Sequence, residues 1–358
     1  MPRTGTVKRI ISLLLVITMC VALACTAAAC GNTADNSIAQ DAGRIVSETD
    51  SELTIIDQAG REVTVGKDID SIALCYRVVI RFLLNLDQGD KITGIGKTED
   101  FLEKLQPSLK SCMDVGKGVA DIEALAELGP DLFIHKSSDV ETLEAVENLG
   151  IPSIGIDVET PEAMLVALDV LGKVCNASGK AEELISYYKN EIIASEELAA
   201  GIEERDRKTA IVMGTSIGKV ADGTMLQGLM LEKAGAINCA ADLKATELWP
   251  TAGTEQIFEW NPDYIFVTGS ESAVYTVDDI YNDPAWSELE AVKNKHVFLI
   301  PAACDSWEFP GVVSTLGINY MMRTMYPELL SDTELEDKVN KFYELAYGRS
   351  FSRDKLGY

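Results

Sequence analysis

One short segment occurs twice in this chain, and it constrains the fold more than any other feature. In each copy a glutamate is followed after six residues by Pro-Asp and an apolar run, at Glu123 with Pro130-Asp131 and again at Glu255 with Pro262-Asp263. The proline ends a helix, the aspartate can hydrogen-bond the turn, and the apolar run is typical of a buried strand. The duplication predicts two halves with a shared topology, each placing one carboxylate at an equivalent surface point.

The chain around the first copy alternates short apolar runs with helical patterns. After a predicted hairpin (53–57 and 61–65), strands are expected at 71–75, 92–96, 132–135 and 153–157, and helices at about 77–86, 121–128, 139–149 and 161–175. Such alternation is typical of βαβ units, so the sheet is expected to be largely parallel and covered by helices.

The pattern restarts after residue 207. Strands are expected at 209–214, 264–269 and 297–301, and helices at about 225–235, 254–260, 311–325 and 332–347. The predicted fold class is therefore α/β, with two Rossmann-like lobes that carry largely parallel sheets.

A stretch without proline, residues 180–205, lies between the two patterns and has apolar residues at near-helical spacing. A continuous helix of this length would span roughly 39 Å and could join two lobes as a rigid strut. The alternative is a long surface helix within one lobe. The predicted organisation is a first lobe at 52–178, an interlobe helix at 179–206 and a second lobe at 207–358.

The N-terminus is typical of an exported protein. Three basic residues in the first nine positions precede an apolar run from Ile10 to Ala24, which suits a secretory signal and is short for a membrane span. Small residues then lead to Cys30, as in a bacterial lipobox. We expect a signal peptide at 1–29, a lipid on Cys30 and a flexible tether at 30–51. Cys25 is a rival lipidation site, and an ordinary secretory signal is the alternative.

Composition excludes several functions. A net charge of −26 would repel nucleic acid, and two histidines cannot build a His-rich metal site or a catalytic network of several histidines. The five cysteines after the N-terminal region form no CxxC pair and predict no disulfide framework. Motifs of serine hydrolases, zinc proteases, P-loop enzymes and dinucleotide-binding enzymes are missing from the body. We therefore expect no enzyme, no cofactor and no resident metal.

Taken in order, several short motifs resemble the class III solute-binding proteins of ABC importers, which include ferric-siderophore, haem and cobalamin binders. The resemblance covers most of residues 53–330. Its carriers are the DQAGREVTV segment at 57–65, residues 123–131, LGIP at 149–152, AGAIN at 234–238, Glu255-Gln256 with Asn261-Pro262-Asp263, and DPAW at 283–286 with AVKN at 291–294.

The resemblance implies a lipid-anchored extracytoplasmic protein, at the cell surface or in the periplasm, that works with a membrane permease and its ATPase subunit. It implies a ligand held between the lobes, a rigid interlobe helix, and docking onto permease arginines through Glu123 and Glu255. A ferric siderophore is the expected ligand, and a corrinoid or haem is the alternative. A surface hydrolase or sensor of the same fold is the distant alternative.

Ligands of parallel α/β sheets bind outside the carboxyl ends of the strands, so the loops there are the expected binding surface. In the first lobe these loops carry an aromatic residue and four cations, which suit an anionic metal chelate. They are Tyr76, Arg77, Lys97, Lys117 and Lys136.

Aromatic residues dominate the corresponding loops of the second lobe. We expect Trp249, Tyr275 and Trp307 to contact ligand, since indole rings are flat apolar surfaces that suit catecholates or macrocycles. Trp249 has core packing as its alternative. His135 could ligate a metal axially, but a satisfied histidine beside a strand is the favoured interpretation.

Overall fold

The computed structural model describes residues 40–96, 100–243, 249–270 and 272–358. The predicted signal peptide, residues 30–39 of the predicted tether with Cys30, and Lys97 lie outside the described residues. Residues 38–358 form one compact unit.

The repeated Pro-Asp segment forms the same hydrogen-bonded turn in both halves. In the first, Asp131 Oδ2 accepts from Ser71 N at 2.9 Å and Ser71 Oγ at 2.9 Å, while Asp131 N donates back to Ser71 O at 3.0 Å. In the second, Asp263 Oδ2 accepts from Thr209 N and Oγ1, both at 2.9 Å, and Asp263 N donates to Thr209 O at 3.0 Å. Each aspartate thus fastens the start of its own strand to the start of the neighbouring strand.

The first lobe contains a five-stranded parallel sheet with the order β6-β5-β4-β7-β8. Its strands are β4 (Ile72–Leu74), β5 (Ile92–Ile95), β6 (Met113–Asp114), β7 (Leu132–Lys136) and β8 (Ser153–Ile156). Its helices are α2 (Val79–Asn85), α3 (Asp100–Leu105), α4 (Ile122–Leu128), α5 (Val140–Glu147) and α6 (Pro161–Val174), with 3-10 turns η1 (Gly89–Lys91) and η2 (Pro107–Ser111). The strand order reverses at β4, where a crevice is expected.

The second lobe contains a four-stranded parallel sheet with the order β10-β9-β11-β12. Its strands are β9 (Thr209–Met213), β10 (Ile237–Asn238), β11 (Tyr264–Val267) and β12 (Val297–Leu299). The surrounding helices are α8 (Leu226–Lys233), α9 (Thr254–Trp260), α10 (Val277–Asn282), α11 (Glu290–Lys293) and α14 (Arg353–Leu356), with the turns η3 (Glu204–Asp206) and η4 (Pro284–Trp286). The predicted α/β class with two parallel-sheet lobes is confirmed.

A separate antiparallel sheet precedes the first lobe. The predicted hairpin is formed by β2 (Glu52–Ile56) and β3 (Glu62–Gly66), and β1 (Ile45–Glu48) pairs with β2. The tether prediction is therefore wrong for residues 45–48. Their side chains are exposed, so the strand gains its stability from the backbone ladder, which a polar composition does not reveal.

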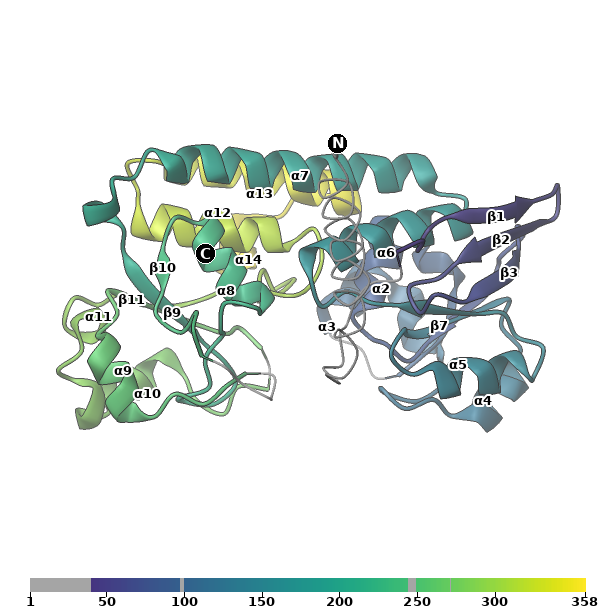
Figure 1. The fold of residues 1–358 in the computed structure, drawn as a ribbon, viewed down its shortest axis with the longest axis horizontal. Coiled ribbons are helices and arrows are strands. Elements are labelled where there is room, and N and C mark those ends of the chain that lie inside the picture. Colours follow the sequence, from purple (N-terminus) through teal and green to yellow (C-terminus); the bar gives the residue numbers. More distant parts are fainter. Residues whose placement is uncertain (1–39, 97–99, 244–248, 271) are drawn as a thin grey trace, which may run out of the picture. The chain divides into compact units, whose positions relative to one another are not determined.

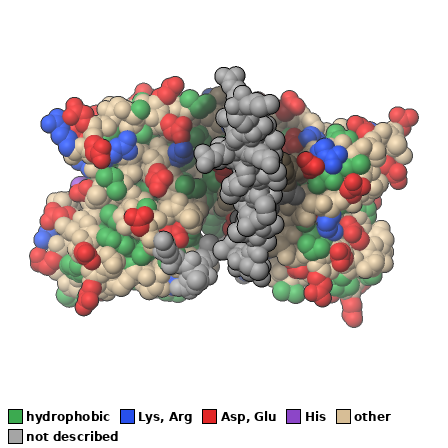
Figure 2. Space-filling model, in the orientation of Figure 1, with side chains coloured by type: hydrophobic (Ala, Val, Ile, Leu, Met, Phe, Trp, Pro, Cys, Tyr) green, Lys and Arg blue, Asp and Glu red, His purple; other side chains and the backbone are tan. Residues whose placement is uncertain are grey.

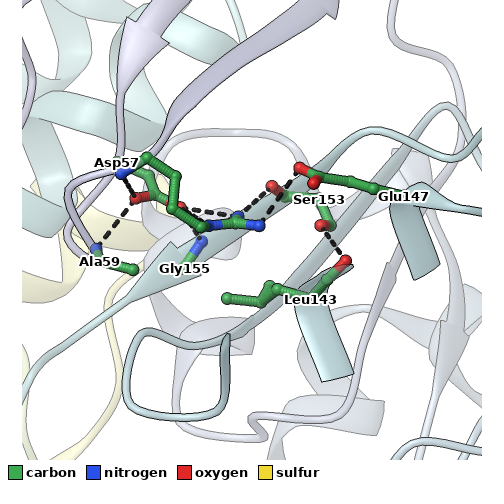
Figure 3. Close-up of polar contacts among 7 residues, drawn as sticks. Asp57, Ala59, Leu143, Glu147, Ser153 and Gly155 are labelled. Atoms are coloured by element: carbon green, nitrogen blue, oxygen red, sulfur yellow. Dashed lines mark hydrogen bonds and ion pairs between the residues drawn. The ribbon is translucent and has the colours of Figure 1, made fainter. Parts of the chain in front are cut away.

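The turn of this hairpin is fastened to the first lobe by Asp57 and Arg61 (Figure 3). The Asp57 carboxylate is fully buried and accepts from Ala59 N, Arg61 N and Gly155 N, each at 2.9 Å. The Arg61 guanidinium donates to Asp57 Oδ2 at 2.8 Å, to Ser153 O at 2.6 Å and to Glu147 Oε1 at 3.2 Å. The DQAGR segment therefore joins the hairpin to β8 and α5.

The long helix α7 (Ser178–Ala200) connects the lobes (Figure 1). It packs against α6 of the first lobe and against α8 and α12 of the second. The prediction of a helix to residue 205 is wrong at its C-terminus, because the helix ends before Gly201, a residue without a β-carbon that disfavours helix continuation. The remaining 23 residues still span about 35 Å.

The lobes are joined a second time by the C-terminal helices, α12 (Ser314–Met325) and α13 (Asp332–Tyr347). Helix α13 packs on α2 of the first lobe, and Asn85 Nδ2 donates to Ala346 O at 3.4 Å. Lys338 Nζ of α13 contacts Glu191 of α7 at 2.6 Å. The largest cluster of buried apolar side chains contains residues of both lobes. The lobes therefore share a core, which favours limited relative motion over free hinge bending.

The five described cysteines are free thiols, in line with the sequence prediction. Cys75, Cys175 and Cys304 are buried, and burial raises the pKa of both the Cys75 and the Cys175 thiol to about 12. They are small core residues with no thiolate character at neutral pH.

Candidate ligand-binding site

The carboxyl ends of β4 and β7 bring together two of the predicted ligand residues. The Lys136 ammonium lies 5.1 Å from the centre of the Tyr76 ring, and the Tyr76 hydroxyl donates to Glu159 Oε1 at 2.9 Å. Burial, together with the negative charge of Glu159, raises the pKa of Tyr76 well above its usual range. Tyr76 therefore stays neutral and supports the Lys136 cation, and half-buried Arg77 follows it at the surface.

Lys117 lies on the loop beside these residues. Gly118 N donates to Cys75 O at 3.1 Å, which ties the loop after β6 to the end of β4. A β-carbon on Gly96, at the end of β5, would lie 3.1 Å from the Lys117 Cα, so this close approach requires glycine. Lys117 is exposed. Three of the four predicted cations thus lie at or after the carboxyl ends of β4, β6 and β7. Of these strands β4 and β7 are neighbours, while β5 separates β6 from β4.

These cations differ from their surroundings in charge. Figure 2 shows Asp and Glu side chains scattered over both halves of the face in view, as a net charge of −26 requires. An anion approaching the molecule therefore finds its favourable contacts at the few places where cations gather at strand ends.

In the second lobe, Trp249 and Tyr275 meet at Gly214, directly after β9. The Tyr275 hydroxyl donates to Gly214 O at 2.8 Å, and a β-carbon on Gly214 would come within 2.6 Å of the Trp249 ring. Trp249 adopts a positive φ of 60° and is partly exposed. Two predicted residues that are 26 positions apart in the sequence thus share one strand end, and they supply an aromatic surface with few charges.

Trp307 must be removed from the predicted set. Its side chain is only 1% exposed, its Nε1 donates to the Tyr343 hydroxyl at 3.1 Å, and its ring packs against Tyr320 and Tyr358. Tryptophan is equally suited to a core or to a ligand surface, and its position after a strand did not distinguish the two.

The buried His135 is paired within the first lobe. Its Nε2 lies 2.9 Å from Asp139 Oδ2, and the ring stacks on Phe133. His135 is thus a core residue beside its strand, as expected, but it is only partly satisfied, because its buried Nδ1 has no hydrogen-bond partner among the described residues. In the part of the chain that the structure describes, no group of three or more metal-ligating side chains is assembled.

Two acidic residues at the strand ends were missed by the sequence analysis. Glu159 follows β8 and therefore lies at a carboxyl strand end, where only basic and aromatic residues were predicted to contact ligand. Glu308 has no comparable signal. It is buried, accepts a hydrogen bond from Gly269 N at 2.9 Å and another from Thr268 Oγ1, and burial raises its pKa to about 7.

The two repeat glutamates occupy equivalent positions. Glu123 and Glu255 are each the second residue of a seven-residue helix, α4 and α9, and both are exposed. Neither side chain has a hydrogen bond or ion pair with another described residue. Both helices lie on the side of the two lobes away from α7 (Figure 1).

Comparison with known proteins agrees with this geometry. Residues 72–304 match the profile of the periplasmic binding protein family. The molybdate-binding protein MolA of Haemophilus influenzae is 25% identical over 85% of this chain and 93% of its own, and the iron-uptake system-binding protein of Bacillus subtilis is 26% identical over 81% and 90%. A periplasmic solute-binding protein of Veillonella parvula superposes with a TM-score of 0.76 at 25% identity, covering 85% of this chain and 95% of its own.

The relatives that share this arrangement of two parallel sheets joined by a long helix are named as solute-binding proteins. The chain belongs to the periplasmic binding protein family and is a substrate-binding component of an ABC importer, a system that also comprises a permease and an ATPase. The described residues include no helix of the length and hydropathy needed to cross a bilayer.

Proposed function

We propose that this protein captures an anionic metal complex, a ferric siderophore in the first instance, between its two sets of strand-end loops and delivers it to the permease. The observation that supports the proposal is the contact of Lys136 with the Tyr76 ring in a strongly acidic chain. Arg77 follows Tyr76 directly, and Gly118, next to Lys117, hydrogen-bonds to Cys75, the residue before Tyr76. The B. subtilis relative named as an iron-uptake binding protein supports an iron ligand.

An oxyanion such as molybdate is a second candidate, because the relative MolA is named for binding it. The burial of Trp307 also favours this candidate, since it leaves Trp249 and Tyr275 as the aromatic surface of the second lobe. A corrinoid or haem, the alternative from the sequence, would rely more heavily on aromatic stacking and is correspondingly less favoured.

Tryptophan fluorescence titration tests the ligand class. We expect quenching by a ferric hydroxamate or ferric catecholate, or a change with sodium molybdate, and a weaker response to cobinamide and haem. The Trp249→Phe variant should lose most of the fluorescence signal. The Trp286→Phe variant should keep it, because Trp286 is buried in an apolar cluster of the second lobe. A saturable response to cobinamide or haem alone would discard the anionic-ligand proposal, and so would a response to none of the five.

We further propose that Glu123 and Glu255 contact basic residues of the permease. Two exposed carboxylates without intramolecular partners, repeated at equivalent points of the two lobes, match a membrane partner with two arginines or lysines.

The lipid anchor remains a proposal that rests on the sequence around Cys30. Metabolic labelling with radioactive palmitate should mark the wild-type protein and the Cys25→Ser variant but not Cys30→Ser. Label retained in Cys30→Ser would move the site or remove the anchor.

A further inference from the structure

Four consecutive residues between β12 and α12 are buried, although three of them are polar. They are Asp305, Ser306, Trp307 and Glu308, with exposed fractions between 1% and 6%. We call Asp305–Glu308 the clasp segment. Buried polar groups in a loop are costly unless they are paired, so their partners show what the segment does.

The first partner of the clasp segment is Arg81, in α2 of the first lobe. Arg81 Nε donates to Asp305 Oδ1 at 2.5 Å, with both side chains no more than 2% exposed. The Tyr347 hydroxyl of α13 donates to the other oxygen of Asp305 at 2.8 Å. The Arg81 guanidinium also lies 4.8 Å from the centre of the Phe309 ring. The ion pair is thus dry and fixed in its geometry.

At its other end the clasp segment holds the second sheet. Glu308 Oε1 accepts from Gly269 N at 2.9 Å and from Thr268 Oγ1, the two residues that follow β11. Gln227 of α8 donates to Glu308 O at 3.0 Å. Four residues of chain therefore connect α2 of the first lobe to the strand end that leads toward Tyr275.

Arg81 is also close to the first-lobe ligand loop. Val79 N donates to Tyr76 O at 3.0 Å and Ile80 N donates to Arg77 O at 3.1 Å, so the Tyr76–Arg77 loop is the start of the helical turn that bears Arg81. Fixing the Arg81 side chain therefore fixes the orientation of this loop.

We propose that Arg81, Asp305 and Glu308 are positioning residues, which hold the ligand loop of the first lobe in register with the strand end of the second. The proposal deepens the proposed function and rests on it for the role of these loops. A buried ion pair is often no more stabilising than a well-packed apolar pair of similar volume. What the ion pair adds is a fixed orientation, because the hydrogen bonds between the two charged groups form in only one relative geometry.

The test compares three variants with the wild type. Asp305→Asn removes one charge of the Arg81–Asp305 pair, and Arg81→Met/Asp305→Leu removes both charges of that pair. Glu191→Leu/Lys338→Met is the control, because it deletes another ion pair (2.6 Å), partly buried between α7 and α13, that does not reach the ligand loops. Amide hydrogen exchange of residues 76–81 and 267–270 is measured without ligand, together with unfolding in urea.

We expect about tenfold faster exchange at 76–81 in Asp305→Asn and no change at these residues in the control. In Arg81→Met/Asp305→Leu the urea midpoint should lie closer to that of the wild type than it does in Asp305→Asn, while exchange at 76–81 stays fast. If Asp305→Asn or Arg81→Met/Asp305→Leu unfolds at the wild-type urea midpoint and its exchange at 76–81 is also unchanged, the proposal is overturned, because the pair then has no positioning role.

A binding measurement completes the test. The five probes are ferric hydroxamate, ferric catecholate, molybdate, cobinamide and haem. A probe that the wild type binds should bind Arg81→Met/Asp305→Leu about tenfold more weakly. This is the loss expected when the population of the binding-competent loop conformation falls to about a tenth. Wild-type affinity in that variant would contradict the clasp. If the wild type binds none of the five, the proposed ligand class is wrong, and the exchange measurement still decides the clasp.

Discussion

At the scale of single residues, Glu308 is the most unusual group in the described chain. Its carboxyl is buried, and its Oε2 has no hydrogen-bond partner among the described residues. Burial, opposed by the hydrogen bonds from Thr268 and Gly269, raises its pKa from 4.5 to about 7. Burial and, to a smaller extent, the negative charge of Glu308 raise the pKa of Tyr275 above its usual value, so Tyr275 is neutral throughout this range.

The raised pKa predicts a loss of stability as pH rises. Between about pH 4.5 and 7 the unfolded chain releases this proton while the folded protein keeps it, so the unfolding free energy falls with pH, by about 3 kcal/mol once pH exceeds 7. Glu308→Gln should remove this slope and gain stability over the wild type at pH 8 but not at pH 4.5. Urea unfolding of the wild type and of Glu308→Gln at pH 4.5 and pH 8 measures the two unfolding free energies. An equal pH dependence in the two proteins would contradict the prediction.

The sequence predicted which strand ends lie together, while the ligand role of their residues stays a prediction. Tyr76 and Lys136 are close to one another because β4 and β7 are parallel neighbours, whose carboxyl ends meet at one edge. Trp307 failed because the loop after β12 turns inward, and a tertiary contact such as Trp307 to Tyr343 leaves no local signal. The pairing of Arg81 with Asp305 was missed for the same reason, because the two residues are 224 positions apart in the sequence.

At the scale of elements, the fastening of the hairpin by Asp57 and Arg61 is the contact most sensitive to substitution. Arg61→Met would leave the fully buried Asp57 carboxylate without its cation, and we expect a loss of about 3 kcal/mol in unfolding free energy. Arg44→Met is the control, because its ion pair with Asp41 is more than half exposed on both sides and should contribute at most about 0.5 kcal/mol. Equal urea midpoints for the two variants would show that the fastening contributes little.

Elements were predictable from the sequence in proportion to their length and repetition. The helix–Pro-Asp–strand units appeared at the expected residues in both lobes, because proline, aspartate and an apolar run act locally. The two-residue strands β6 and β10 and the short helices α3, α10 and α11 were missed. Segments of this length cannot establish a hydrophobic period, and tertiary packing decides them.

At the scale of the whole molecule, the repeat glutamates predict the effect of docking variants. Glu123→Ala/Glu255→Ala should reduce uptake of the transported solute at least tenfold without changing solute affinity, because two charge contacts to the permease are lost. Glu127→Ala/Glu259→Ala is the matched control, since both residues are exposed and lie four positions later on the same helices. Radiolabelled uptake in cells and titration of the purified protein separate the two effects, and normal uptake in the first variant would remove the docking role.

The central claim is that one solute is held by the strand ends of both lobes at once. Amide hydrogen exchange with and without a saturating probe from the titration tests it most directly. The account predicts slower exchange at residues 75–78 and 136–138 of the first lobe and, in the same sample, at 214–216 and 272–275 of the second. Protection confined to one lobe, or lying away from these strand ends, would contradict it.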